Sequence, residues 1–348
     1  MTAEGCGGKR LVDMIDLYCG DCLDILPTLP DNSVDLIATD PPYFKVKGEA
    51  WDRQWDKPSE FLAWLGRVMK QFRRVLKPNG SLYVFASPKM AARVEVLTGE
   101  RFNVLNRIRW VKEAGWHNKT KKDELRSFLS PWEEIIFAEH YGAEGCAKGE
   151  AGYGAKCDEL RGFVFEPLRA YLVGERDRAG LTTRQVAEAY QKKSGSRTVT
   201  GMAGHWFEKV QWTLPTLENY EWLRETFARL NHGGSYLRRE YDDLRREYDD
   251  LRRPFNVSAE VPYTDVWTFP TVPFYAGKHP CEKPAAMLEH MIRSSSREGA
   301  TVLDAFMGSG ATGKAARKLG RKFIGIEKDA QWFEKAKAGV EAVQLGLV

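Results

Sequence analysis

The sequence predicts an α/β fold in which a doubly wound parallel sheet carries a mainly helical inserted domain. Three observations support this. Short apolar runs alternate with helical patterns in the first and last parts of the chain, the middle part has helical patterns without that alternation, and a Gly-rich, charged stretch opens the middle part. The 348 residues suffice for about two domains of ~100–200 residues each. We expect 1–140 and 262–348 to form one sheet domain around an insert at 141–261.

Apolar runs predict five strands before the insert. They are expected at 15–21, 34–40, 81–87, 104–111 and 133–140. A strand buried on both faces reads as a continuous apolar run, so these runs indicate a sheet covered by helices on both sides. An amphipathic pattern predicts one covering helix at about 59–76, and the residues Lys77-Pro78-Asn79-Gly80 are expected to end it.

The last part of the chain resumes the alternation of strand and helix. Strands are predicted at 301–306 and 322–327, and the glycine-rich Met307-Gly308-Ser309-Gly310 leads from the first of them into a helix at about 311–319. A final helix is expected to run to about 345. The same sheet is therefore predicted to continue after the insert.

The insert has one well-marked helix start. Thr182 and Gln185 form a capping box, and Leu181 and Val186 have the spacing of a hydrophobic staple, so a helix is expected over 182–192. With a preceding helix at about 166–179 and the following segment VTGMAGHWFEKV, it resembles a helix-turn-helix unit, although the connection around 191–200 is long for one. A plain helical subdomain is the alternative.

The sequence LRREYDD occurs twice, at 237–243 and 244–250, and LRR follows. The apolar and aromatic positions have coiled-coil spacing; they are Leu237, Tyr241, Leu244, Tyr248 and Leu251. Two heptads fall short of the three or four that a free coiled coil needs. The seam must therefore pack either on the insert itself or on a second subunit, and we expect a homodimer.

Composition narrows the class of protein without identifying it. Hydrophobic residues make up 43% and charged residues 29%, which is typical of a globular protein. No apolar stretch approaches the ~18 residues of a membrane span and residues 1–10 lack the apolar core of a secretory signal, so a cytoplasmic location is expected. A net charge of +4 permits nucleic-acid binding through a local patch but does not argue for it.

The six cysteines do not form a disulfide framework in a chain of this length. Cys19 and Cys22 have C-x-x-C spacing, but no second pair and no nearby histidine accompany them. Two thiols at a strand end are favoured over a zinc or redox site, and no metal is predicted.

The tetrapeptide Asp40-Pro41-Pro42-Tyr43 directly follows a predicted strand, where ligands meet a parallel sheet. The exocyclic amine of a nucleobase is a poor nucleophile because its lone pair is delocalised into the ring. The Asp40 carboxylate and the Pro41 carbonyl could accept its two N–H groups and aim the lone pair at an electrophile. Tyr43 would offer a stacking face to an extruded base. The alternative is that Asp-Pro-Pro only ends the strand.

A second set of residues lies at another strand-to-helix turn, Asp304 to Gly310. Glycine allows a ligand to approach the backbone closely, and Glu327, at the end of the next strand, is placed to hold two ribose hydroxyls. These residues predict a cofactor that contains a nucleoside. NAD is one possibility, but the loop does not require it. A P-loop is excluded, because the residue after Lys314 is Ala315 rather than Ser or Thr.

Taken together, the motifs resemble those of the β-class DNA amino-methyltransferases, which use S-adenosylmethionine. The chain has GDCLDILPTLPDNSVDLIATDPPY, an inserted middle, HPCEKP, VLDAFMGSGATG and GIE in that order, and the resemblance covers about 1–140 and 262–348. It implies a Rossmann-like methyltransferase sheet whose first part is the catalytic half and whose last part is the cofactor-binding half. The insert would recognise the DNA target.

The resemblance also implies roles for single residues. Asp40, Pro41, Pro42 and Tyr43 would meet the target base. The cofactor would lie against Asp21, Cys22, His279, Lys283, Pro284, Asp304, Phe306, Gly308, Ser309, Gly310, Thr312 and Glu327. Among these, Asp21 would lie beside its adenine, Glu327 on its ribose and Asp304 near its methionine part.

The insert matches no family motif, so its contacts are predicted from the helix-turn-helix pattern alone. Side chains of the second helix would reach base edges, which selects Arg197, Thr198, Thr200 and His205 as DNA-binding candidates. Trp206 and Phe207 are expected to anchor that helix to the core.

The resemblance favours N6 of adenine in duplex DNA, because DPPY usually accompanies it. N4 of cytosine and an RNA substrate are the nearer alternatives. A 5-cytosine enzyme would need a nucleophilic cysteine, and Cys281 in HPCEKP lies in the wrong place for one. A DNA-binding regulator with an inactive sheet domain is the most distant alternative. A partner endonuclease is left open.

Overall fold

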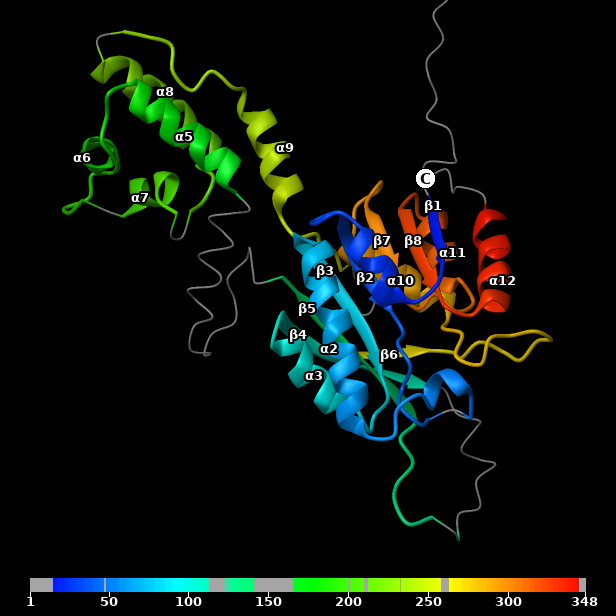
Figure 1. The fold of residues 1–348 in the computed structure, drawn as a ribbon. Coiled ribbons are helices and arrows are strands. Elements are labelled where there is room, and N and C mark those ends of the chain that lie inside the picture. The colour runs from blue at the N-terminus through cyan, green and yellow to red at the C-terminus, as the bar shows by residue number, and fades with distance from the viewer. Residues whose placement is uncertain are drawn as a thin grey trace, which may run out of the picture. The chain divides into compact units, whose positions relative to one another are not determined.

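The computed structural model describes residues 15–46, 48–112, 123, 125–140, 165–199, 201–209, 212–231, 233–257 and 263–343. The chain divides into two compact units (Figure 1). One unit comprises 1–140 and 254–348, and the other comprises 141–253. The chain therefore returns to the first unit at Pro254, before the boundary expected at 262.

The first unit contains an eight-stranded sheet in the order β1-β8-β7-β2-β3-β5-β4-β6. The strands are β1 (Ile15–Cys19), β2 (Val34–Thr39), β3 (Leu76–Ala86), β4 (Asn103–Lys112), β5 (Trp132–Glu139), β6 (Val266–Phe269), β7 (Thr301–Asp304) and β8 (Lys322–Glu327). Neighbouring strands pair in parallel except where β5 pairs with β3 and β4. The predicted α/β sheet is confirmed, but it is mixed rather than wholly parallel, because β5 runs antiparallel to both of its neighbours.

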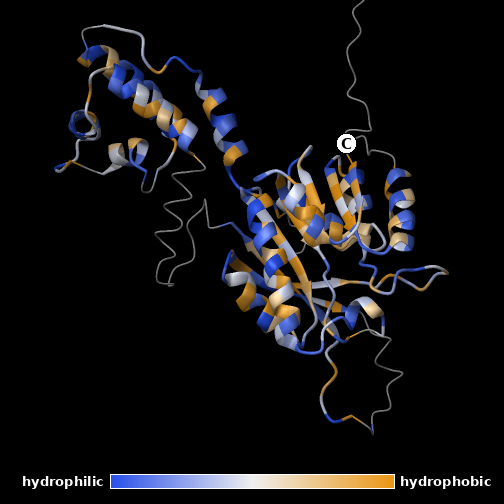
Figure 2. Ribbon diagram, viewed as in Figure 1, coloured by the Kyte–Doolittle hydropathy of each residue, from blue (hydrophilic) through white to orange (hydrophobic). Residues whose placement is uncertain are grey.

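Helices cover both faces of this sheet. They are α1 (Cys22–Ile25), α2 (Pro58–Val75), α3 (Ala91–Gly99), α10 (Ala285–Ser295), α11 (Ala311–Lys318) and α12 (Ala330–Glu341), with short 3₁₀ turns η2 (Leu26–Thr28) and η3 (Ala50–Asp52). In β2, Ile37 faces a core shared with α2 and α3, and Leu36 faces a core shared with α10, α11 and α12. Side chains alternate between the faces because successive residues of a strand point in opposite directions. The middle strands are accordingly mostly hydrophobic, whereas α2 alternates hydrophobic and hydrophilic residues (Figure 2).

The segment Lys77–Gly80 is not the turn that we expected. It belongs to β3, which starts at Leu76 directly after α2 ends, and the pairing of β3 with β2 shifts register between Val34 and Leu36. Lys77 Nζ lies 2.7 Å from Asp35 Oδ1 on β2, and a side chain at Gly80 would come within 3.0 Å of the Asp35 carbonyl oxygen. Pairing with β2 therefore converts a sequence with turn residues into an irregular strand start.

The second unit is a set of helices around its own aromatic core. They are α5 (Glu166–Arg178), α6 (Thr183–Ser194), α7 (Met202–Phe207), α8 (Leu217–Leu230) and α9 (Tyr241–Leu251). The predicted capping box is confirmed, since Gln185 N donates to Thr182 Oγ1 (3.2 Å) and Thr182 N donates to Gln185 Oε1 (2.8 Å). Trp206 and Phe207 are buried in the core, as expected.

The heptad segment packs on this same core. Leu237 and Leu244 are fully buried there, and Tyr241, Tyr248 and Leu251 pack against it. Helix α9 starts only at Tyr241. Leu237 lies before it and has a φ of 50°, which is not a helical value. The seam therefore packs on the core of its own unit, which is the first of the two expected alternatives, and a homodimer stays a prediction. The seam is satisfied locally because the ring of Phe165 stacks on that of Tyr248 with centroids 4.9 Å apart.

No helix in the described ranges is both long and apolar enough to cross a membrane.

Candidate active site

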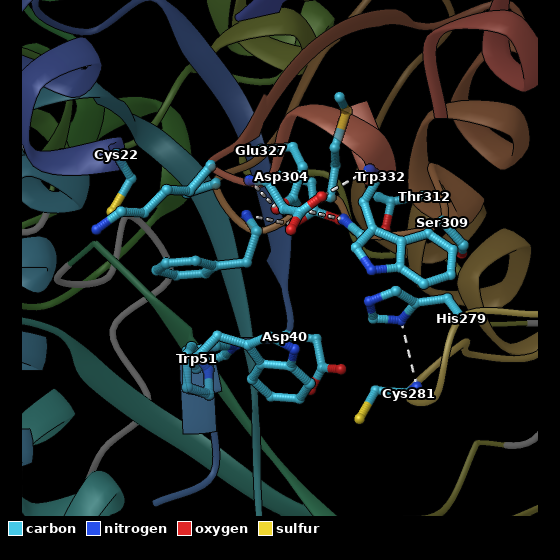
Figure 3. Close-up of a pocket in the computed structure, with 18 of the residues that line it drawn as sticks. Cys22, Asp40, Trp51, His279, Cys281, Asp304, Ser309, Thr312, Glu327 and Trp332 are labelled. Carbon is cyan, nitrogen blue, oxygen red and sulfur yellow. Dashed lines mark hydrogen bonds between the residues drawn. The ribbon is translucent and has the colours of Figure 1, made fainter. Parts of the chain in front are cut away.

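The candidate site is a cavity of about 460 Å³ at the carboxyl ends of the strands in the first unit (Figure 3). Strands β2 and β7 are neighbours in the sheet, and the chain continues from them to β3 on one side and β8 on the other. Ligands of open α/β sheets bind at such a point of divergence, because the loops separate there and leave a crevice.

The cavity assembles most of the residues predicted for the target base and the cofactor. It is lined by Asp21, Cys22, Asp40, Pro41, Pro42, Tyr43, His279, Lys283, Asp304, Phe306, Gly308, Ser309, Thr312 and Glu327. Pro284 and Gly310 are not among the lining residues. Pro284 precedes α10, and Gly310 (φ +72°) lets α11 pack closely on α12, where a side chain would come within 3.1 Å of the Ala336 Cβ.

The two carboxylate oxygens of Asp40 differ in their partners. Its Oδ2 accepts a hydrogen bond from Lys283 Nζ, whereas its Oδ1 is buried and has no hydrogen-bond partner among the described residues. Burial raises the pKa of the Asp40 carboxyl, the Glu133 carboxylate adds to the rise, and the Lys283 ammonium opposes it. Asp40 therefore brings a carboxylate with one unpaired oxygen to the lining of the cavity.

Asp52 shapes the turn that follows Pro42. This fully buried carboxylate accepts hydrogen bonds from Tyr43 N and from Val46 N, both at 2.6 Å. Phe44 and Lys45, between them, have φ values of 62° and 59°, a conformation that is unfavourable for residues other than glycine. Asp52 thus holds a strained turn in place beside Asp40. The sequence held no signal for this, since Asp52 belongs to no motif.

Tyr43 is fixed at both ends. Its backbone is held by Asp52, and its hydroxyl donates to Glu133 Oε2 at 2.8 Å. The ring is only 8% exposed, and Lys283 Nζ lies 5.2 Å from its centroid. Burial, followed by the nearby Asp40 and Glu133 carboxylates, raises the pKa of Tyr43 well above its usual value, so the hydroxyl stays protonated and donates.

The glycine-rich loop after β7 is built by two acids. Asp304 Oδ1 accepts hydrogen bonds from the Thr39 hydroxyl (2.8 Å) and from Phe306 N (3.1 Å). Glu327 Oε2 accepts from Gly308 N (2.8 Å), and its Oε1 accepts from Asp329 N (2.9 Å). Both acids line the cavity while they shape its loops. Burial raises the pKa of Asp304 to about 6 and also raises that of Glu327.

Aromatic rings form another wall of the cavity (Figure 3). The His279 ring lies between Trp51, with centroids 6.4 Å apart, and Trp332, with centroids 4.5 Å apart. Gly308 (φ +48°) faces this wall, because a side chain there would come within 3.1 Å of the His279 ring. Sequence reasoning missed both tryptophans, since neither lies in a motif.

The predicted DNA-binding residues lie in the second unit. Arg197 and Thr198 are exposed on the connection between α6 and α7, and His205 is half-buried on α7. Thr200 lies outside the described residues. Helix α7 has only six residues, so it offers less than two turns to a groove and fits the recognition helix of a helix-turn-helix poorly.

The two cysteines of C-x-x-C are placed differently. Cys19 is exposed, while Cys22 is buried at the start of α1, where burial raises the pKa of its thiol to about 12. Cys281 lines the cavity, and its backbone N–H donates to His279 Nδ1 at 3.2 Å. No group of three His, Cys, Asp or Glu side chains that could hold a metal ion occurs in the described ranges.

Comparisons with known proteins agree on one family. Residues 34–338 match the model of a family described as DNA methylase. The chain is 27% identical over 323 residues to the DNA adenine methyltransferase YhdJ of Escherichia coli (strain K12), covering 90% of this chain and 79% of that protein. It is 36% identical over 347 residues to the type II methyltransferase M2.DpnII of Streptococcus pneumoniae, covering 94% and 89%.

Among solved structures, the chain resembles that of the PvuII DNA methyltransferase (cytosine-N4-specific), with a TM-score of 0.52 and 14% identity, covering 93% of this chain and 85% of that one. At this identity the likeness supports the fold alone.

Proposed function

The chain belongs to the DNA methylase family, and from this premise we propose that it transfers the methyl group of S-adenosyl-L-methionine to N6 of an adenine in duplex DNA. The observation that carries the proposal is that Asp40 lines the cavity and that its buried Oδ1 has no hydrogen-bond partner among the described residues. A buried polar group without a partner costs about 1–3 kcal/mol, and the target amine would supply the missing partner of this oxygen.

The residues of the cavity fit S-adenosyl-L-methionine. At Gly308 the absence of a side chain leaves room beside the His279 ring. The carboxylates of Asp21 and Glu327, at the ends of neighbouring strands, are suited to an adenine amine and to ribose hydroxyls. Phe306 and Trp332 supply apolar surface. When bound, this cofactor supplies an electrophilic methyl group.

Asp40 and the backbone after it would hold the target amine. The free Oδ1 of Asp40 accepts one N–H of the amine, and the Pro41 carbonyl accepts the other. These bonds direct the lone pair toward the methyl group, and the carboxylate stabilises the positive charge that forms on the nitrogen. A base reaches such a recessed site only after it has left the duplex, and Tyr43 and Trp51 line the cavity that it would enter.

Adenine is favoured over cytosine as the target. YhdJ is named as an adenine enzyme, whereas the N4-cytosine enzyme resembles this chain in fold only. The 5-cytosine alternative is not favoured, because YhdJ is named as an adenine methyltransferase and the proposed use of Asp40 needs no cysteine nucleophile. One relative is a type II methyltransferase, so the proposal includes a restriction-modification setting, with or without a partner endonuclease.

We assign target recognition to the second unit. Arg197 and Thr198 lie exposed on one connection of that unit, and His205 lies beside it. The catalytic unit already contains the complete cavity, so a separate helical unit is free to select the sequence.

The test is methylation by the purified full-length protein. Duplex DNA is incubated with S-adenosyl-L-methionine, digested to nucleosides and analysed by mass spectrometry, and single-molecule sequencing of the same DNA locates the site. We expect N6-methyladenine at one sequence, and none with Asp40→Ala. The appearance of N4-methylcytosine, or of no methylated base, would contradict the proposal.

A further inference from the structure

Charged side chains alternate in sign behind Asp40. Lys283 Nζ contacts Asp40 Oδ2 and lies 3.4 Å from Glu133 Oε2, and Lys112 Nζ lies 2.5 Å from Glu133 Oε1. The side chains of Lys283, Glu133 and Asp40 are only 6%, 16% and 18% exposed. Two acids and two bases thus form a nearly buried row whose charges balance.

We infer that Glu133 is a positioning residue for methyl transfer, which shares the Lys283 ammonium with Asp40 and so makes the Oδ1 of the ionised Asp40 a more basic acceptor. This inference rests on the proposed function, since it concerns how Asp40 acts on the target amine. Glu133 comes from β5, far from every motif of the sequence, and it also fixes the Tyr43 hydroxyl at 2.8 Å.

The role follows from the charges that methyl transfer creates. The amine nitrogen would give its lone pair to the methyl carbon, and the electron pair of the broken bond would return to the sulfur of the donor. The nitrogen would be positive until it loses a proton to water. A negative site at Asp40 stabilises that charge. Without Glu133, the Lys283 ammonium would neutralise Asp40 alone, and Lys112 would add a second, uncompensated positive charge.

The protonation states agree with this arrangement. Although burial opposes it, the Lys283 and Lys112 ammonium groups lower the pKa of Glu133 to about 2, so Glu133 stays ionised. Likewise against the effect of burial, Asp40 and Glu133 raise the pKa of Lys283, so Lys283 stays charged. The other titratable groups that face Asp40 are Tyr43 and Asp304, and Cys281 faces Lys283.

The test compares variants that change the charge of the row in opposite directions. Glu133→Gln leaves Lys283 to Asp40 alone, so the single-turnover rate should fall about tenfold or more while the KM for S-adenosyl-L-methionine stays within about threefold. The acid limb of the pH–rate profile should move to lower pH, because Asp40 then ionises more readily. Lys112→Gln removes a positive charge, and its acid limb should move to higher pH.

A matched control lies next to Glu133 on β5. Glu134 lies 3.1 Å from Arg107 Nε and 3.8 Å from Arg109 Nε, and its burial is similar, but it does not contact Asp40, Lys283 or Tyr43 in the described structure. Glu134→Gln also loses ion pairs, yet its acid limb should match that of the wild-type protein. Asp304, which faces the site, is unchanged in the wild-type protein and in the three variants. Differences between their pH–rate profiles therefore come from the charges of the row.

The outcomes separate the two proposals. If the wild-type protein forms no N6-methyladenine, the proposed function fails. If it does form N6-methyladenine, either of two results overturns the inference about Glu133. One is that Glu133→Gln keeps the wild-type rate and acid limb. The other is that the acid limbs of Glu133→Gln and Lys112→Gln move in the same direction. If Glu133→Gln does not fold, Lys112→Gln decides alone, and an unmoved acid limb in that variant overturns the inference.

Discussion

Asp40 and Asp304 occupy equivalent places in the sheet but use their carboxylates in opposite ways. Each lies at or just after the carboxyl end of a strand, β2 or β7, and the two strands are neighbours. Asp304 accepts hydrogen bonds from Thr39 and Phe306, so it is used by the protein itself. Asp40 is paired with a cation on one oxygen and has no partner on the other in the described structure. Burial raises the pKa of both acids, so burial does not distinguish them, whereas the unpaired oxygen of Asp40 is the feature on which its proposed role rests.

The largest expected effect separates these two acids directly. Asp40→Ala should lower methyl transfer by a factor of about 10²–10⁴ or more, because it removes the acceptor for the target amine. Cofactor affinity should change by no more than a few-fold, since Asp40 engages the base. Single-turnover rates and calorimetric titration with S-adenosyl-L-methionine measure the two quantities. Near-wild-type turnover would show that methyl transfer does not need the Asp40 carboxylate.

The next effect tests the loop that Asp304 builds. Gly308→Ala should weaken S-adenosyl-L-methionine binding by about tenfold, because a Cβ would meet the His279 ring at 3.1 Å and the backbone has a φ of +48°. Gly277→Ala is the matched control, since Gly277 also has a positive φ (+80°) but no atom within 4 Å. If the two variants bound S-adenosyl-L-methionine with equal affinity, the need for glycine at position 308 would lie in its backbone conformation rather than in room for the cofactor.

A smaller effect is expected in the pH dependence of stability. Burial raises the pKa of Asp304 to about 6, above its usual value of 3.8, so the folded state binds the proton more tightly than the unfolded state does. This group therefore destabilises the fold above pH 6, and that cost is lost as the pH falls from about 6 to about 4. Asp304→Asn has no titrating carboxyl, so its Tm should gain less than the wild-type Tm between pH 7 and pH 5. Parallel thermal melts of both proteins would reveal an equal gain if the assignment were incorrect.

The smallest effect is expected at Cys281. Cys281→Ser should keep most of the methyl-transfer activity, because amine methylation needs no covalent bond between enzyme and base. The thiol lines the cavity, so the substitution changes the wall but not the acceptor. Complete loss of activity in a folded variant, measured with the same single-turnover assay, would return attention to the 5-cytosine alternative.

The sequence by itself determined the parts of the protein that depend on local pattern. Continuous apolar runs predicted the described strands except β6, and acids and glycines directly after two of them predicted where the cavity lies. The capping box at Thr182 and Gln185 could also be predicted from the sequence, because its two partners are three residues apart. The order of the motifs also identified the family.

Only the tertiary structure decided which distant residues meet. Tyr43 and Glu133 are bonded across 90 positions, and Lys283 and Asp40 across 243, so no local pattern joins them. Trp51 and Trp332 likewise meet only through His279. The turn-like segment Lys77–Gly80 became a strand, and the heptad seam packed inward rather than on a second subunit. In each case the physical reason is the same, since long-range pairing and burial outweigh local preference and are fixed only when the chain folds.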